Sequence, residues 1–472
     1  MNRNRMNKKR MGRARVLSRA AAGMLAAALC FQPMTALAGP AGDSSLTSSS
    51  SNAGPGGGSG SSNSGSTGSS GGSTSVSNGG VSAVTSGLGV YRVTENEGIG
   101  AIARGVDVSY WQQNVNWSQV ASDNVQFAML ATRFRGNVDP FFAMNAANAS
   151  QAGLRLGAYI YSYATSVEMA QQEADFVLNL IKDYPISFPV VFDAEDANTL
   201  GTLTQSQVSD VINAFCKRIQ DAGYYPMVYA NEYWIANKID MSKISYDIWV
   251  AKYQQKYTYS KTSMWQASNT GSVKGVNGNV DIDYLYKDYT QIIPGNTWRT
   301  IAGNRYYYQN HVMQKAAWIN DGQNWYYMNA AGNPSKGWLE LSGKKYYLEA
   351  DGHMITGWKT LDGGWRYFDA SGEQATGWRA VDGNWYFMAD NGLMQTGWLD
   401  LGGKKYYLDA SGAMYAGITF EMDGNTWQAA ADGSCTVVLP EENAAGNGGS
   451  TDGQTPITGS QSPVQPSGPA GV

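Results

Sequence analysis

The chain has 472 residues, enough for two or three domains, and 15% of them are charged and 12% aromatic. Residues 1–38 hold eight of the 34 basic residues and no acidic residue, so the remainder carries 26 basic and 38 acidic residues, a net charge of −12. This balance argues against a nucleic-acid partner, which usually requires a basic face. With two histidines and three cysteines, a His-based catalytic centre, a disulfide scaffold and a metal cluster are also disfavoured, and no metal or cofactor is expected.

The segment 1–38 is typical of a secretory signal peptide. Its basic stretch is followed by the apolar run AAAGMLAAALCF and by Ala36–Ala38, which has the small-x-small pattern of a cleavage site. The apolar run is short for a membrane span, so export without membrane attachment after cleavage is predicted. Cys30 raises the alternative of a lipid anchor, which the bulky Leu29 before it disfavours.

Two segments are too polar to fold. Residues 39–95 are mostly Gly, Ser and Asn and are predicted to form a flexible linker, because they cannot bury enough apolar surface. Residues 436–472 have a similar composition and are predicted to form a disordered tail. The folded regions are therefore expected at 96–292 and 293–435.

Strand and helix patterns alternate through the first folded region. Strands are predicted at 104–109, 126–134, 154–164, 188–195, 226–231, 247–253, 263–268 and 280–286, and helices at 139–153, 167–183 and 205–223. Thr165 with Glu168 and Thr204 with Gln207 have the spacing of capping boxes, and Gly153 and Gly223 fall where helices should end. Repeated βα units with about eight strands predict the α/β class and a flattened, irregular β/α (TIM-like) barrel.

The strand predicted at 188–195 ends in carboxylates. Its apolar run is followed by Asp193, Glu195 and Asp196, and carboxylates there are costly unless they lie at the open end of the strand. Asp193 and Glu195 should project together, with Asp196 pointing elsewhere. Function in such barrels gathers at the C-terminal ends of strands, and two carboxylates there can divide the acid and base work of glycoside hydrolysis. A solvated or capping acid at a strand end gives the same pattern.

Six segments in chain order resemble family 25 glycoside hydrolases, the lysozymes that cut peptidoglycan between N-acetylmuramic acid and N-acetylglucosamine. They are RGVDVSYWQQNVNW (104–117), GAYIYSYA (157–164), VVFDAED (190–196), MVYANEYW (227–234), DIWVAKY (247–253) and MWQASNTGSVKGVNGNVDIDYLY (264–286). The resemblance implies that Glu195 is the general acid and that Asp193 stabilises positive charge, by orienting the substrate's own N-acetyl group. It also implies that Asp107 and Asp281 line the acidic groove.

Aromatic residues in the same segments are candidates for sugar stacking. Tyr161 and Tyr229 are the first choices, and Tyr159, Tyr163 and Trp265 are further candidates. The three tyrosines at 159, 161 and 163 share strand parity, so all or none should face the barrel interior. Many relatives carry His at the position of Ile160, so contacts to the sugar are expected to differ here.

The second folded region repeats every 20 residues. The tryptophans in register are Trp298, Trp318, Trp338, Trp358, Trp378 and Trp398, and a second aromatic follows each one nine positions later. Glycines between the two supply turns, so each unit is predicted to be a short β-hairpin. Such units cannot bury both faces alone, which predicts a stacked solenoid.

These repeats resemble the cell-wall-binding repeats of choline-binding modules and clostridial toxins. The resemblance implies an aromatic box that holds a quaternary ammonium by cation–π attraction. The candidate ligand-binding residues are Trp338, Trp358, Trp378, Trp398, Tyr347, Trp365, Tyr367, Trp385 and Tyr407. In two units, Lys345 and Lys405 stand at the position that Trp365 and Trp385 hold in theirs. A cation at this position disfavours choline binding in those units. Carbohydrate binding, or mere packing between hairpins, remains open.

The sequence thus predicts a secreted, wall-associated N-acetylmuramidase of Gram-positive type. Its expected partners are peptidoglycan and a wall polymer, choline-bearing teichoic acid or another glycan, bound by the repeats. The alternatives are an inactive wall-binding surface protein and a glycosidase acting on another N-acetylhexosamine polymer.

Overall fold

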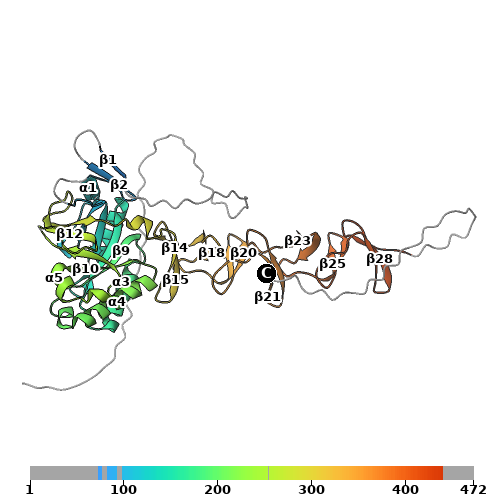
Figure 1. The fold of residues 1–472 in the computed structure, drawn as a ribbon. Helices are drawn as coiled ribbons and strands as arrows, with labels where there is room; N and C mark the ends of the chain where they lie inside the picture. Colours follow the sequence, from blue (N-terminus) through green and yellow to red (C-terminus); the bar gives the residue numbers. More distant parts are fainter. Residues whose placement is uncertain (1–72, 77–81, 93–97, 254, 440–472) are drawn as a thin grey trace, which may run out of the picture. The chain divides into compact units, whose positions relative to one another are not determined.

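The computed structural model describes residues 73–76, 82–92, 98–253 and 255–439 (Figure 1). The predicted signal peptide, most of the predicted linker and residues 440–472 lie outside these ranges. Within the described ranges, no helix has the length and apolar character needed to cross a membrane.

Eight strands close into a barrel in the order β10-β11-β12-β13-β4-β5-β8-β9. These are β4 (Ala103–Val108), β5 (Phe127–Ala131), β8 (Arg155–Tyr161), β9 (Ile186–Asp193), β10 (Pro226–Asn231), β11 (Asp247–Ala251), β12 (Thr262–Gly271) and β13 (Val280–Leu285). Neighbouring strands are parallel except that β13 runs antiparallel to both β12 and β4. The predicted irregular β/α barrel is confirmed.

Helices follow several of the strands. They are α1 (Trp117–Ser122), α2 (Phe142–Gln151), α3 (Val167–Ile181), α4 (Gln205–Asp221) and α5 (Glu232–Asn237). The capping box of Thr204 and Gln207 begins α4, as predicted. The predicted cap of α3 is wrong by one residue, because the extended backbone at Ser166 lets its hydroxyl accept from the Met169 amide.

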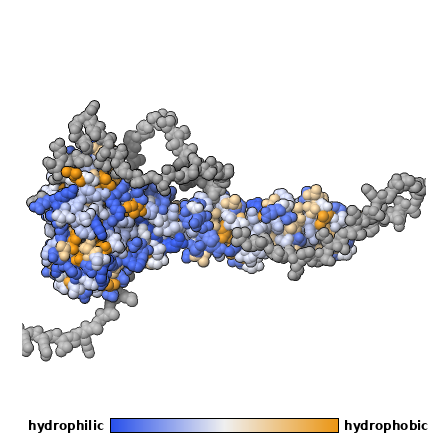
Figure 2. All heavy atoms as spheres, viewed as in Figure 1, coloured by the Kyte–Doolittle hydropathy of each residue, from blue (hydrophilic) through white to orange (hydrophobic). Residues whose placement is uncertain are grey.

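The side chains of the barrel strands contribute to two apolar clusters. One cluster lies between the sheet and the helices and includes Val190 and Phe192 of β9, and the other lies inside the barrel and includes Phe188 and Val191. All eight residues of β9 are buried, as expected for a parallel strand covered on both faces. On the barrel surface drawn in Figure 2, hydrophilic residues dominate and apolar residues form small groups. Since Val191 faces the interior, Asp193 continues the same inward row.

The end of the predicted linker is folded, which corrects that prediction. Strands β1 (Ser73–Val76), β2 (Ser82–Ser86) and β3 (Gly89–Arg92) form a small antiparallel sheet. Tyr91 is fully buried in the cluster between sheet and helices, and the Asn124 side chain bonds both backbone groups of Arg92. The sheet was not predicted because its short alternating run directly follows the long polar stretch and was assigned to the linker with it.

The repeats form successive β-hairpins, of which the first gains a third strand and the last two join with the final strand in a five-stranded sheet. The period of 20 is confirmed. Their strands are β14 (Thr297–Ile301), β15 (Asn304–Gln309), β16 (Val312–Met313), β17 (Ala317–Asn320), β18 (Trp325–Met328), β19 (Gly337–Leu341), β20 (Lys344–Leu348), β21 (Gly357–Leu361), β22 (Gly364–Phe368), β23 (Gly377–Val381), β24 (Asn384–Met388), β25 (Gly397–Leu401), β26 (Lys404–Leu408), β27 (Ile418–Met422), β28 (Asn425–Ala429) and β29 (Cys435–Val437). Each repeat tryptophan pairs across its hairpin with the aromatic nine residues later, as Trp358 does with Tyr367. The last strand passes the predicted end at 435 by two residues.

The first hairpin shares the core of the barrel domain. The Tyr308 hydroxyl donates to the Lys182 carbonyl at 2.8 Å, and the Arg299 guanidinium lies 3.9 Å and 4.3 Å from the ring centroids of Tyr224 and Tyr308. Arg299 is 1% exposed. The predicted boundary at 293 therefore separates residues that pack together.

Candidate active site

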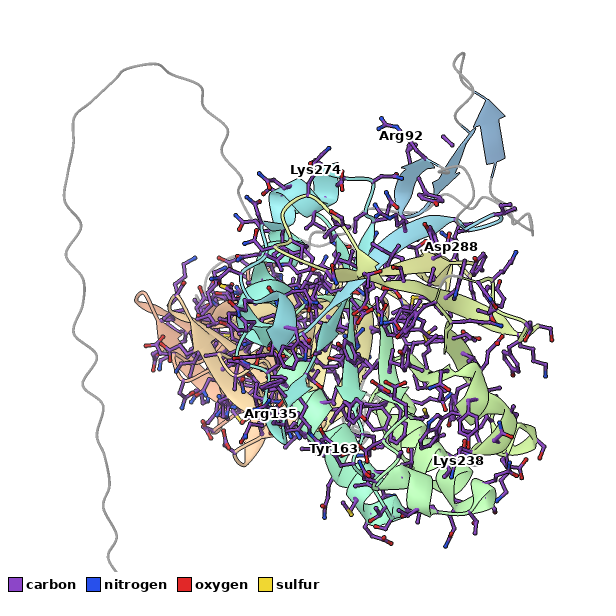
Figure 3. All side chains as sticks on the ribbon, turned by 90° about the vertical axis from the view of Figure 1, so that its left-hand side faces the viewer. Arg92, Arg135, Tyr163, Lys238, Lys274 and Asp288 are labelled. Atoms are coloured by element: carbon purple, nitrogen blue, oxygen red, sulfur yellow. The ribbon has the colours of Figure 1, made fainter. Side chains whose placement is uncertain are left out.

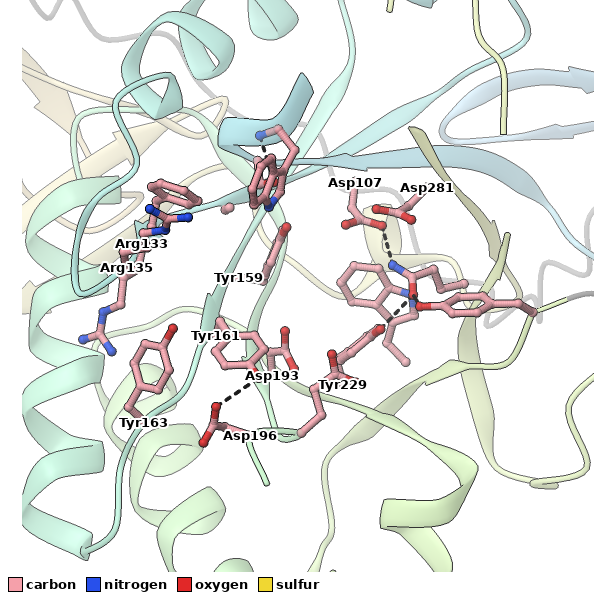
Figure 4. Close-up of a pocket in the computed structure, with 18 residues that line it drawn as sticks. Asp107, Arg133, Arg135, Tyr159, Tyr161, Tyr163, Asp193, Asp196, Tyr229 and Asp281 are labelled. Atoms are coloured by element: carbon pink, nitrogen blue, oxygen red, sulfur yellow. Dashed lines mark hydrogen bonds between the residues drawn. The ribbon is translucent and has the colours of Figure 1, made fainter. Parts of the chain in front are cut away.

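An open cleft of about 410 Å³ lies at the C-terminal ends of the parallel strands (Figure 4). It is lined by Asp107, Ser109, Trp111, Ala131, Arg133, Phe134, Arg135, Tyr159, Tyr161, Tyr163, Asp193, Glu195, Asp196, Tyr229, Trp249, Tyr253, Gln266 and Asp281. The four acids predicted to be catalytic all line it. Because β13 is antiparallel to its neighbours, its beginning lies at this end of the barrel, and Asp281 is its second residue.

Asp193 is the last residue of β9 and the acid that this strand contributes to the cleft. It is 5% exposed, and its Oδ1 accepts no hydrogen bond from any described residue. Burial raises the pKa of Asp193 well above the usual range, and the nearby charges of Glu195 and Asp196 raise it further. A buried oxygen without a donor is available to a donor on a bound molecule.

Glu195 lies two residues further on and is half-buried. Burial raises the pKa of Glu195, and a hydrogen bond from Asn231 Nδ2 to Oε2 at 3.4 Å opposes the rise. Asn231 is the last residue of β10, so the ends of two neighbouring strands meet here. Glu195 thus combines access to the cleft with a carboxyl that loses its proton at a higher pH than an ordinary glutamate does.

Asp107 and Asp281 are direct cross-strand partners on β4 and β13. Asp107 is 4% exposed, and its pKa is raised well above the usual range by burial and then by the charges of Asp281 and Asp283. Burial raises the pKa of Asp281 to about 6. Asp283, a further acid that sequence reasoning missed, is fully buried beneath the cleft-lining residues, and its Oδ1 accepts a hydrogen bond from Trp249 Nε1 at 3.0 Å.

A hydrogen-bonded chain fixes Asp107, and sequence reasoning missed its central residue, Gln266. Gln266 Oε1 accepts from the hydroxyls of Tyr229 at 2.7 Å and Tyr253 at 2.9 Å, so its amide group turns toward Asp107 and donates to Oδ2 at 2.7 Å. Trp265 was predicted to bind the substrate instead of Gln266, and that prediction is wrong. Trp265 is 6% exposed and faces away from the cleft, where it packs on Tyr284 and donates to a backbone carbonyl.

Tyr159, Tyr161 and Tyr163 all line the cleft, in agreement with the prediction that all three or none face the barrel interior. The Tyr161 hydroxyl donates to Asp196 Oδ2 at 3.2 Å. Asp196 therefore also faces the cleft, which corrects the expectation that it points elsewhere. Ile160 is fully buried on the helix side of the sheet, so its difference from many relatives lies outside the cleft.

The end of the cleft away from Asp107 and Asp281 holds residues that the sequence analysis did not predict. Arg133 and Phe134 form the short strand β6 (Arg133–Phe134), which pairs with β7 (Asn137–Val138). Arg135 follows in the turn, and Trp111, 66% exposed, lies edge-on to Phe134. Within the described residues, no group of three or more His, Cys, Asp or Glu side chains is arranged to hold a metal ion.

In the repeats, the boxes of Trp358 and Trp378 each include one aromatic residue from the following hairpin, a partner that sequence reasoning missed. Trp358 lies 5.1 Å from Tyr367, 6.4 Å from Trp365 and 4.8 Å from Tyr386, measured between ring centroids. Trp378 lies in the same way against Phe387 and Tyr406, and Trp385 is 47% exposed.

The predicted box at Trp338 differs. Arg366 replaces the tyrosine opposite Trp338, and its guanidinium lies 5.1 Å from that ring. The Trp338 pocket, of about 390 Å³, is also lined by Lys345. Tyr347 packs on Trp338 within its own hairpin, and Tyr407 packs on Trp398. The Arg366 guanidinium thus already occupies the place that a quaternary ammonium would take at Trp338.

Comparison with known proteins agrees with this architecture. Residues 106–276 match Glycosyl hydrolases family 25, residues 335–376 and 375–420 match a choline-binding repeat, and residues 317–333 match a putative cell wall binding repeat. The chain belongs to glycosyl hydrolase family 25.

The chain is similar to three proteins over part of its length. The chain is 31% identical over 189 residues to the uncharacterized protein YegX of Escherichia coli (strain K12), covering 38% of this chain and 68% of YegX. It is 30% identical over 195 residues to Lysozyme M1 of Streptomyces globisporus, covering 38% and 66% of the two chains. The structure of CbpJ from Streptococcus pneumoniae TIGR4 is 29% identical, with 37% of this chain and 64% of that chain covered and a TM-score of 0.29.

Proposed function

We propose that the protein is a secreted peptidoglycan hydrolase, an N-acetylmuramidase that cleaves the β-1,4 bond between N-acetylmuramic acid and N-acetylglucosamine. The observation that carries the proposal is the meeting of Asp107, Asp193, Glu195 and Asp281 in one cleft at the C-terminal end of the barrel. The names of two relatives, Lysozyme M1 and an autolytic lysozyme of Clostridium acetobutylicum, support it. The intact set of acids favours an enzyme over an inactive binding protein.

Glu195 acts as the general acid. It is half-buried yet lines the cleft, and its raised pKa keeps a proton on the carboxyl at a pH where an ordinary glutamate has lost it. That proton passes to the glycosidic oxygen as the bond to the sugar C1 breaks. After the leaving sugar departs, the Glu195 carboxylate takes a proton from the attacking water.

Asp193 orients the N-acetyl group of the sugar being cut. Its Oδ1, buried and without a donor, accepts the N–H of that group and turns the acetyl oxygen toward C1. The acetyl oxygen then stabilises the positive charge that develops on the sugar ring. Asp107 and Asp281 close the other side of the cleft, where the Gln266 amide holds Asp107 in place.

The repeats hold the enzyme at the cell wall. The box of Trp358, Trp365 and Tyr386 has three aromatic faces for a quaternary ammonium, so choline-bearing teichoic acid is the proposed ligand there. The Trp338 unit, with its own cations, suits another wall glycan. Tethering raises the local concentration of substrate at the cleft without adding a catalytic contact.

The assignment of Glu195 is tested by Glu195→Gln, which keeps the shape of the side chain and removes the transferable proton. The turnover number for release of reducing ends from purified peptidoglycan should fall by at least about 100-fold, while sedimentation with cell walls stays unchanged. Glu168→Gln is the matched control, because Glu168 lies on the first turn of α3 outside the cleft. Near-normal turnover in Glu195→Gln would refute the assignment.

A further inference from the structure

The cleft is electrostatically divided. Five carboxylates line it, those of Asp107, Asp193, Glu195, Asp196 and Asp281. Its two cationic side chains, Arg133 and Arg135, lie at the end away from Asp107 and Asp281 (Figure 4). A neutral sugar can bind along the acidic part, whereas a negatively charged substituent is repelled there and accepted only at the arginine end.

The two arginines are not equivalent. Arg133 Nη1 donates to Glu173 Oε1 at 2.5 Å, and its guanidinium lies against the rings of Tyr163 and Phe176, so its charge is matched inside the protein. Glu173 is 5% exposed and also accepts from Ser162, which fixes the pair. Arg135 is exposed and forms no ion pair with any described residue. Arg135 is therefore the cation of this cleft with charge to offer a ligand.

The hairpin holds Arg135 in a defined place. Phe134 pairs with Asn137, which leaves Arg135 and Gly136 as a two-residue turn with φ of 49° and 83°. This turn favours Asn or Gly at its first position, so an arginine there is conformationally disfavoured and marks a candidate functional residue. The guanidinium lies 5.1 Å from the centroid of the Phe134 ring, which itself stacks on Tyr110 at 4.0 Å. Figure 3 shows Arg135 and Tyr163 on the same side of the barrel.

We propose that Arg135 determines specificity by binding a carboxylate carried by the muramyl residue of the substrate. This rests on the proposed function, because in peptidoglycan the muramyl residue carries acid, as a free lactyl carboxylate or as carboxylates of the attached peptide. The guanidinium forms charge-assisted, two-pronged hydrogen bonds with a carboxylate. The pairing places the substituted sugar at the arginine end of the cleft and the bond to be cut beside Glu195.

The test combines a variant with a chemically altered substrate. Wild-type protein, Arg135→Gln and Arg135→Lys are assayed as full chains on peptidoglycan before and after its carboxylates are capped with a neutral amine. Capping should raise the wild-type KM about tenfold, which is the loss of about 1.4 kcal/mol, with kcat unchanged. Arg135→Gln should show the raised KM on both substrates, and Arg135→Lys should recover part of the difference.

The controls separate the possible sources and failures. Lys261→Gln removes an exposed cation just before β12, at the other end of the barrel, and should respond to capping as the wild type does. Glycan strands stripped of peptide carry only the lactyl carboxylate; a capping effect on these strands assigns that group, and an effect confined to intact peptidoglycan assigns the peptide. An equal response to capping by Arg135→Gln and wild type overturns the inference alone. No reducing ends from uncapped peptidoglycan with the wild type would overturn the proposed function as well.

Discussion

Asp281 is predicted to cost the protein stability at neutral pH. Burial raises its pKa from an ordinary 3.8 to about 6, so between these values the folded chain binds more protons than the unfolded chain. Stability is therefore lost as the pH rises through this window. A difference of about two pH units corresponds to about 3 kcal/mol, and partial exposure of the side chain reduces the expected value to about 2 kcal/mol.

Asp281→Asn removes this cost because an amide does not ionise. At pH 7.5 the variant should be about 2 kcal/mol more stable than wild type, a rise of about 4–8 °C in Tm for a domain of this size. At pH 4 the gain should be below about 0.5 kcal/mol, since Asp281 is then protonated in the folded state. Calorimetric unfolding of the full chain at both pH values measures the difference.

Asp210→Asn is the matched control for this prediction. Asp210 is an exposed acid paired with Lys243 at 2.9 Å, and its replacement should change the free energy of unfolding by less than about 1 kcal/mol. A gain in Asp281→Asn that is equal at pH 7.5 and pH 4, or a loss at pH 7.5, would show that ionisation of Asp281 does not destabilise the folded chain.

Two further predictions concern the repeats. A chain ending at residue 316 keeps the first hairpin on the barrel, and it should still hydrolyse soluble fragments but no longer sediment with cell walls. A chain ending at residue 293 should have a lower melting temperature than the chain ending at residue 316. Equal melting temperatures would contradict a core shared between the barrel and the first hairpin. Trp358→Ala should weaken choline binding several-fold by titration calorimetry. Trp338→Ala should leave choline binding unchanged, since Arg366 already lies over that ring, and a loss equal to that of Trp358→Ala would contradict the box assignment.

Patterns with a fixed period predicted most of the fold. The inward row of β9 and its acidic end were visible because a buried parallel strand is almost entirely apolar, so Asp193 and Glu195 stood out against it. The hairpins were visible because aromatic side chains recur every 20 residues. In both cases the information is local in the sequence.

The remaining features depend on contacts between distant segments. Trp265 and Gln266 are adjacent on a strand, so their side chains face opposite sides of the sheet. The sequence alone does not indicate which of the two faces inward, and the prediction of Trp265 was wrong. Tyr386 joins the box of Trp358 across a hairpin boundary. Arg135 was missed because its role depends on a turn that places it in the same cleft as Asp193 and Glu195, which lie more than fifty residues away in the sequence.

The central claim, muramidase chemistry at Glu195, is tested most directly by mass spectrometry of the fragments released from borohydride-reduced digests of purified peptidoglycan. The wild type should release fragments that end in reduced N-acetylmuramic acid, and Glu195→Gln should release none. Fragments that end in reduced N-acetylglucosamine, or no fragments from a wild-type protein that still sediments with the walls, would contradict it.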